Sequence, residues 1–143
     1  MSITAEAREQ LIRRWFRMWL DKEDTGITAL FAADAIYTES WGPEYRSAEA
    51  VRHWFEEWNT RGSVLVWDIR QFLHQGDQTV VEWRFQCRMN DGTTDAFDGL
   101  SLVVWAEDGR IQRLTEYGCN SDRYDPYQNG PEPVFRDNAH PWF

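Results

Sequence analysis

The sequence predicts a single α+β domain in which a curved antiparallel sheet wraps around N-terminal helices. Before residue 62, apolar residues recur at steps of three and four, as on the buried side of a helix. After residue 62 they alternate with polar residues, as in half-buried strands, and short turn sequences separate the alternating segments. Helices followed by a strand meander are typical of an α+β domain, because short connections make neighbouring strands antiparallel.

Length and composition favour one domain with a well-filled core. The chain has 143 residues, of which 42% are hydrophobic and 15% aromatic. We therefore treat residues 1–143 as one domain, with its core at about residues 5–120 and an aromatic, proline-rich C-terminal extension at residues 121–143 that is suited to strap over a surface or a pocket mouth. The nine tryptophans are an unusual excess, and they suggest an aromatic-lined cavity, a dimer interface or both.

The charge of the chain limits the kinds of partner that it can have. A net charge of −9 and a pI of about 4.7 argue against nucleic acid or an anionic membrane, because like charges repel. A neutral or apolar ligand is favoured instead. The first residues lack the basic start and apolar run of a signal peptide, and no run approaches the roughly 18 apolar residues of a membrane span. We expect a cytoplasmic protein.

Cysteine and histidine show no metal or redox pattern. Cys87 and Cys119 lie in separate strand-like segments, so we expect two free thiols. The three histidines fall in different kinds of element: His53, His74 and His140. We expect neither a metal site nor a cofactor.

The first half of the chain predicts two longer helices, a short helix and a short strand. Thr4 is placed to cap the first helix, and its apolar positions follow the helical period: Leu11, Trp15, Met18 and Trp19. A polar break at residues 21–26 precedes a short helix at residues 27–32. A strand at residues 36–39 then carries Tyr37 and Glu39 on one face.

The next helix begins after a turn formed by Trp41, Gly42 and Pro43. Ser47 is a plausible N-cap, and one side of the helix carries an apolar stripe: Val51, Trp54, Phe55 and Trp58. Four long strands are predicted after it, with glycine-containing turns between them: residues 64–73, 79–89, 94–105 and 111–119.

The strand at residues 79–89 separates its polar and apolar side chains cleanly. Glu82, Arg84 and Gln86 share one side, whereas Trp83 and Phe85 share the other. The polar side could face solvent. Alternatively, it could line a cavity while the aromatic side packs in a dimer interface. The period of the strand alone does not decide between these two arrangements.

Two later strands carry further candidates for a pocket. Phe97 and Ser101 share one face of the strand at residues 94–105, and Gly99 between them could open space for a ligand or mark a bend. Leu114 and Glu116 share one face of the last strand. Glu116 is then either an edge residue in water or an acid in a pocket.

The order of these elements resembles the nuclear transport factor 2-like superfamily, and within it the SnoaL-like and ketosteroid-isomerase-like domains. The resemblance covers about residues 5–120 and is carried by three sequence features: residues 30–35 running into 37–39, the helix start at 46–49, and residues 108–117. It implies a cone-shaped fold, the cystatin-like roll, in which the sheet surrounds one deep, mostly apolar pocket. It also implies a homodimer.

Comparison with ketosteroid isomerases places their general base on Glu39. Their oxyanion-hole tyrosine falls on Trp15, and their protonated oxyanion-hole aspartate falls on Ser101. Both strong hydrogen-bond donors to a steroid dienolate are therefore replaced. We expect a base at Glu39 but no steroid isomerisation.

The chain also resembles limonene epoxide hydrolases, and this resemblance involves other positions. Their first-strand tyrosine and asparagine fall on Tyr37 and Glu39, and their late aspartate falls on Glu116. Their arginine and aspartate fall on Glu82 and Arg84 in reversed order. An acid–base relay through Glu116, Arg84 and Glu82 is implied. Both comparisons make the polar side of residues 79–89 the pocket side.

The resemblance thus implies a pocket for a small hydrophobic molecule. One expectation is a cofactor-independent isomerase, dehydratase or cyclase that acts on a small hydrophobic carbonyl compound, with Glu39, Glu116 and Arg84 as catalytic residues. Substrate contacts are expected from both halves of the chain: Trp15, Trp19, Tyr37, Trp54, Phe55, Trp58, Glu82, Gln86, Phe97, Ser101 and Leu114. The alternatives are a non-catalytic ligand-binding module and a dimeric scaffold. The expected dimer interface is the side of Trp83 and Phe85.

Overall fold

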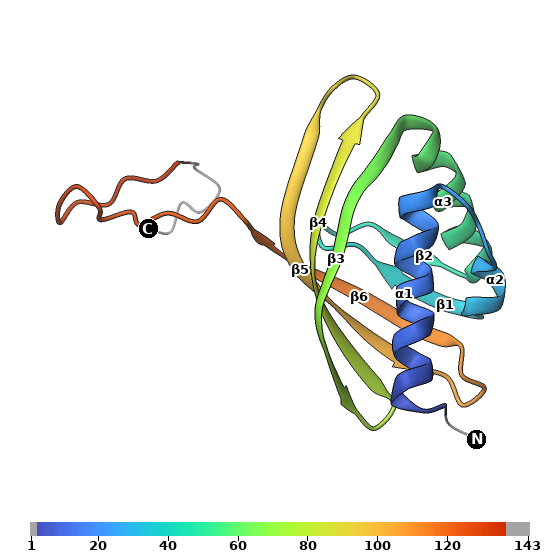
Figure 1. Ribbon diagram of the computed structural model, residues 1–143. Coiled ribbons are helices and arrows are strands. Elements are labelled where there is room, and N and C mark those ends of the chain that lie inside the picture. The colour runs from blue at the N-terminus through green and yellow to red at the C-terminus, as the bar shows by residue number, and fades with distance from the viewer. Residues whose placement is uncertain (1–2, 137–143) are drawn as a thin grey trace.

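The computed structural model describes residues 3–136 and shows helices packed against one curved sheet (Figure 1). The predicted α+β architecture, with a curved sheet wrapped around N-terminal helices, is confirmed. The elements follow in this order: α1 (Ala5–Asp21), α2 (Ile27–Leu30), β1 (Phe31–Thr38), β2 (Glu44–Arg46), α3 (Ala48–Arg61), β3 (Gly62–Gln75), β4 (Gln78–Met89), β5 (Thr94–Trp105) and β6 (Ile111–Asn120).

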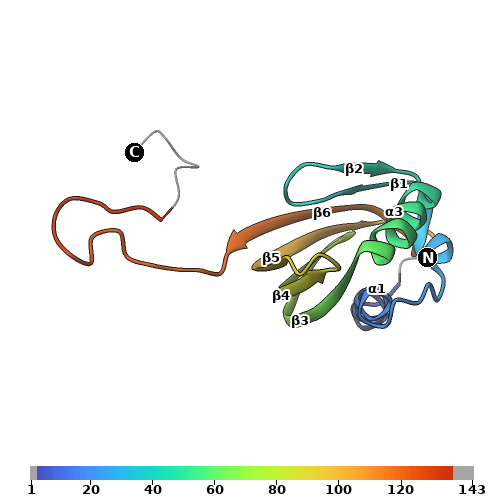
Figure 2. The same ribbon diagram turned by 90° about the horizontal axis from the view of Figure 1, so that it is seen from above.

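The sheet has the strand order β2-β1-β6-β5-β4-β3. Its strands are antiparallel neighbours except β1 and β6, which run parallel, so the sheet is mixed rather than purely antiparallel. Figure 2 shows α1 and α3 on the concave side of the sheet. The parallel pairing of β1 with β6 is possible because a long connection that includes α3 separates these two strands along the chain.

The two longer helices begin where their caps predict. The Thr4 side chain accepts a hydrogen bond from the backbone N–H of Ala7, and the Ser47 side chain accepts one from Ala50. On α1 the apolar stripe faces inward, and Trp15 has no exposed surface. The caps and the apolar period therefore act together to fix both helices.

The segment between these helices differs from the prediction. The short helix ends at Leu30 rather than at residue 32, and β1 begins at Phe31, five residues earlier than predicted. Phe31 pairs with Ile111 of β6, so long-range strand pairing overrides the local helical pattern. The sequence also missed β2, in which Tyr45 pairs with Tyr37 across a hairpin.

The four long strands were predicted to within two residues at every end, and β5 has the predicted bounds.

The orientation of β4 is the reverse of the expectation, because its aromatic side and not its polar side faces the interior. Trp83 is only 1% exposed and packs inside with Phe85, whereas Arg84 is exposed on the outer side together with Glu82 and Gln86, which are partly exposed. Burying the charged side chains without partners would be unfavourable because they would lose their hydration, so the aromatic side faces inward.

The reversed β4 also changes the expected dimer interface. Trp83 and Phe85 contact Trp67 and Phe97 within the chain, with ring centroids 5.2 to 5.8 Å apart for the Trp67–Trp83, Trp67–Phe85, Trp83–Phe97 and Phe85–Phe97 pairs. The prediction that these two side chains form an interface is wrong, because they are part of the interior. A homodimer remains a prediction without an assigned interface.

Gly99 of β5 makes room for the Trp83 ring rather than for a ligand. A Cβ at Gly99 would lie 2.6 Å from Cη2 of Trp83 and 2.6 Å from the carbonyl oxygen of Tyr117. We expect Gly99→Ala to lower the free energy of unfolding by about 1–3 kcal/mol, measured by urea denaturation, because the ring and the backbone must both shift. Gly118→Ala is the control, since its nearest neighbour, Ser40, is 3.3 Å away. Equal losses in the two variants would contradict this explanation.

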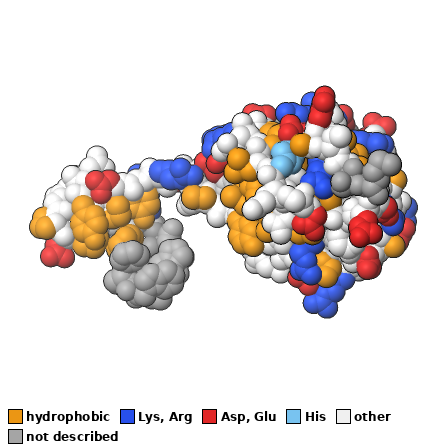
Figure 3. Space-filling view, turned by 90° about the horizontal axis from the view of Figure 1, so that it is seen from below, with side chains coloured by type: hydrophobic (Ala, Val, Ile, Leu, Met, Phe, Trp, Pro, Cys, Tyr) orange, Lys and Arg blue, Asp and Glu red, His pale blue; other side chains and the backbone are white. Residues whose placement is uncertain are grey.

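Residues 121–136 of the C-terminal extension leave the end of β6 and run away from the sheet (Figures 1 and 2). Arg123 ties the base of the extension to the sheet by donating to Asp98 at 3.0 Å, and the Val134 N–H donates to the Pro126 carbonyl within the extension. Figure 3 shows hydrophobic side chains on its surface. The expected strap over a surface or a pocket mouth is not formed by residues 121–136, and the end of the extension, with His140, lies outside the described residues.

No helix within residues 3–136 has the length and hydropathy needed to cross a bilayer. Cys87 and Cys119 are free thiols, as predicted. Within the same residues, no three metal-ligating side chains are grouped so that they could hold a metal ion.

Candidate active site

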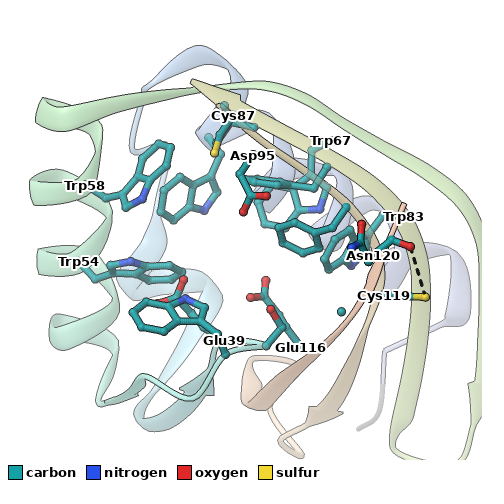
Figure 4. A pocket seen from close by; sticks show the side chains of 17 residues that line it. Glu39, Trp54, Trp58, Trp67, Trp83, Cys87, Asp95, Glu116, Cys119 and Asn120 are labelled. Atoms are coloured by element: carbon teal, nitrogen blue, oxygen red, sulfur yellow. Dashed lines mark hydrogen bonds between the residues drawn. The ribbon is translucent and has the colours of Figure 1, made fainter. Parts of the chain in front are cut away.

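A pocket of about 500 Å³ lies between α3 and the concave face of the sheet (Figure 4). Its wall is largely aromatic, and these side chains come from helices, strands and the turn after β1: Trp19, Trp41, Trp54, Trp58, Trp67, Trp83, Phe85 and Phe97. Three carboxyl groups also line it: Glu39, Asp95 and Glu116. An apolar cavity with a few converging polar groups is the usual form of a small-molecule site.

Glu116 projects from β6 into the pocket beside the buried Leu114. The Tyr37 hydroxyl donates to Oε2 of Glu116 at 2.6 Å. Burial raises the pKa of Glu116 to about 8, the Tyr37 hydrogen bond opposes this rise, and the charge of Glu39 adds to it. Glu116 is therefore mostly protonated at pH 7. Its Oε1, which the Tyr37 bond leaves free, can carry that proton.

Glu39 follows the end of β1 and faces the same pocket. The Tyr45 hydroxyl donates to Oε2 of Glu39 at 2.7 Å. Burial raises the pKa of Glu39, whereas hydrogen bonds from Tyr45 and Trp41 lower it. Glu39 accepts two hydrogen bonds that lower its pKa, whereas Glu116 is more deeply buried and accepts one, so Glu39 is the first of the two acids to ionise as pH rises.

Two tyrosines hold these acids in place. Burial raises the pKa of Tyr37 well above its ordinary value, and burial together with the Glu39 hydrogen bond raises the pKa of Tyr45. Both hydroxyls therefore remain protonated donors. The Tyr45 ring also stacks on Trp54 with centroids 4.4 Å apart, which fixes the donor relative to the pocket wall. Glu116, which is mostly protonated, and Glu39, which ionises more readily, thus face the same cavity.

The structure brings six of the predicted site residues to the pocket: Trp19, Glu39, Trp54, Trp58, Phe97 and Glu116. Five others lie in the core rather than on the pocket wall: Trp15, Tyr37, Phe55, Ser101 and Leu114. Of these, Tyr37 still acts on the site through Glu116. Ser101 accepts a hydrogen bond from Nε1 of Trp83 at 3.0 Å, so it orients an aromatic wall residue.

The remaining predicted residues, Glu82, Arg84 and Gln86, do not reach the pocket. They lie on the outer side of β4, opposite the pocket-lining Phe85 and Trp83. The predicted relay through Glu116, Arg84 and Glu82 is wrong, because the sheet separates the acid from the other two side chains. Arg84 faces solvent, where its charge stays hydrated.

Several residues in and beside the pocket were not predicted from the sequence. Tyr45 was missed because the three-residue β2 carries no pattern of its own, although its pairing with Tyr37 places the two donors side by side. Trp67 lies in the strand predicted at residues 64–73 but was not named as a pocket candidate, and Trp83 was assigned to a dimer interface. For Trp83 the signal was the alternation of β4, whereas on β3 a register shift between Val64 and Val66 breaks the period of two before Trp67.

Comparisons with known proteins agree with this fold. A family model described as the SnoaL-like domain matches residues 12–114. No curated protein matches the sequence. Among solved structures, a Catenulispora acidiphila protein with a ketosteroid isomerase-like fold, in complex with trimethylamine, has a TM-score of 0.64 at 20% identity, covering 76% of this chain and 84% of that one.

Two further solved structures show the same arrangement. An LEH-like epoxide hydrolase of M. tuberculosis has a TM-score of 0.69 at 12% identity, covering 78% of this chain and 82% of that one. TerC, co-crystallised with polyporic acid, has a TM-score of 0.61 at 17% identity, covering 78% and 91%. At such identities the likeness shows the fold alone. The family match, together with this cone-shaped architecture, shows that the chain belongs to the SnoaL-like domain family of the nuclear transport factor 2-like superfamily.

Proposed function

We propose that the protein is a cofactor-independent acid–base enzyme that acts on a small hydrophobic carbonyl compound. The observation that carries this proposal is the pair of carboxyl groups in one aromatic pocket, each held by its own tyrosine donor. Their environments separate their pKa values, since Glu116 is held protonated and Glu39 ionises first. Two acids with separated pKa values are suited to one base role and one acid role.

In this mechanism, Glu39 removes a proton from the carbon next to the substrate carbonyl. Glu116 donates a hydrogen bond from its protonated carboxyl group to the carbonyl oxygen, where negative charge develops. Return of the proton to another carbon gives isomerisation. Loss of a hydroxyl group from the next carbon, which takes the proton from Glu39 and leaves as water, gives dehydration. Attack of the carbanion on a second carbonyl, whose oxygen then takes up that proton, gives an aldol-type cyclisation.

The structural neighbours support a small molecule as the ligand. The C. acidiphila neighbour was crystallised with trimethylamine and TerC with polyporic acid, and the M. tuberculosis neighbour is an epoxide hydrolase. A pocket of about 500 Å³ is of the size that holds such ligands.

A second candidate function is non-catalytic binding of a small ligand. It is favoured by one observation, namely that both pocket acids already accept a hydrogen bond from a tyrosine. A satisfied carboxyl group needs no reaction to explain its presence. The two functions differ in turnover, because binding alone predicts none.

The first test is a ligand search by native mass spectrometry on the purified protein. We expect a retained small molecule of a few hundred daltons, and we expect turnover when that molecule or its precursors are assayed. The blocking variant is Gly118→Phe, because a side chain at this pocket-lining position starts 3.3 Å from Ser40 and 3.5 Å from Phe97 and its ring would have to enter the cavity. A ligand that the blocked and folded variant retains equally well would contradict the pocket assignment.

A further inference from the structure

The charged groups that line the pocket all have one sign. Glu39 and Glu116 project from one side, and Asp95, at the start of β5, projects towards them from the other (Figure 4). Within residues 3–136, no lysine or arginine lines this pocket. An anionic ligand would meet the carboxylates of Glu39 and Asp95 and a chain of net charge −9, so it would be repelled.

The aromatic wall is suited to hold a cation. Trp19 packs against both Trp54 and Trp58, with ring centroids 4.8 Å and 5.4 Å apart. Tyr45 stacks on Trp54 and restrains its ring. An ammonium group within about 6 Å of an indole ring is attracted by the negative face of the ring, most strongly for tryptophan and where water is excluded.

Two buried donors beside the pocket are compatible with a ligand that also carries an acceptor atom. Trp19 and Trp67 line the pocket and are 3% and 6% exposed. Their indole N–H groups have no hydrogen-bond partner in the described part of the chain. A buried donor without a partner is unfavourable, and because neither nitrogen has accessible surface, the ring must turn slightly before a ligand oxygen can accept from it and remove that cost.

From these three observations we infer that the ligand carries a substituted ammonium group, held between the indoles of Trp54 and Trp58 and the carboxylates of Glu39 and Asp95. This inference rests on the proposed function, because it names the charged end of the molecule bound in the same pocket. The oxygen that accepts from Trp19 or Trp67 accords with the carbonyl group of the proposed substrate.

The test uses three probes of similar branched shape but different charge. They are choline, which is cationic, 3,3-dimethylbutan-1-ol, which is neutral, and 3,3-dimethylbutanoate, which is anionic. Titration is followed by tryptophan fluorescence and by calorimetry at low and at physiological salt. We expect choline to bind at least tenfold more tightly than the neutral alcohol, and the butanoate to bind most weakly. The preference for choline should shrink as salt rises.

Asp95→Asn is the matched variant, with Asp68→Asn on the outer side of β3 as its control for the same change in net charge. Asp95→Asn is expected to reduce the preference for choline several-fold while leaving alcohol binding unchanged. Asp68→Asn should change neither. If choline and the alcohol bind equally, or if choline does not bind, the inference of a cationic ligand is overturned. The acid–base proposal is judged separately, by the turnover of Glu39→Gln.

Discussion

At pH 9, the Glu116→Gln variant is expected to be more stable than the wild-type protein by about 3 to 4 kcal/mol. Burial raises the pKa of Glu116 from 4.5 to about 8, so the folded protein keeps this proton to a higher pH than the unfolded chain. The stabilisation is fully present below pH 4.5 and is lost as pH rises through about 8. Each pKa unit corresponds to about 1.4 kcal/mol, and water in the pocket reduces the total.

Glutamine removes this dependence because its amide has no proton to lose in that range. Its side-chain oxygen can still accept from Tyr37, so the variant keeps the hydrogen bond that Glu116 has. At pH 4.5 the two proteins should therefore have similar free energies of unfolding. The difference between them should grow between pH 5 and pH 9.

Urea denaturation at several pH values measures this difference. Glu82→Gln is the control, because it removes a carboxyl group from the outer side of β4. Its stability should follow that of the wild type at every pH. If the curves for Glu116→Gln and wild type run parallel from pH 5 to pH 9, Glu116 is not held protonated by the fold.

The elements of this fold were predictable because their signals are local. Thr4 and Ser47 cap the helices that they were expected to cap, and the glycine turns set the strand ends to within two residues. The early start of β1 was not predictable in this way. It depends on the pairing of Phe31 with Ile111, 80 residues away along the chain.

The site was predictable only in part, and strand geometry explains why some residues were assigned to the wrong side of the sheet. A period of two sorts β4 into two sides but does not say which side is inside, so Arg84 was placed in the pocket and Trp83 outside it. The Tyr37–Glu116 contact depends on the parallel register of β1 and β6, in which Tyr37 pairs with Leu114. Both residues were recognised as pocket candidates, whereas their hydrogen bond could come only from the folded structure.

Once a substrate is identified, Glu39→Gln is expected to lower kcat by about 10²- to 10⁴-fold, the usual contribution of a positioned general base. Glutamine has the shape of glutamate and can accept from Tyr45, so the pocket should keep its form. What is lost is the ability to take up the substrate proton. Glu44→Gln is the control, because its exposed carboxylate pairs with Arg46 outside the pocket.

Tyr45→Phe separates the role of Glu39 as a base from a purely structural role. The Tyr45 hydrogen bond lowers the pKa of Glu39, so its removal should raise that pKa further. Since a base acts in its ionised form, the acid limb of the pH–rate profile should move to higher pH, while the maximal rate changes much less than in Glu39→Gln. A profile that keeps its acid limb in Tyr45→Phe, or a kcat that survives in Glu39→Gln, would remove Glu39 from the mechanism and favour the binding function.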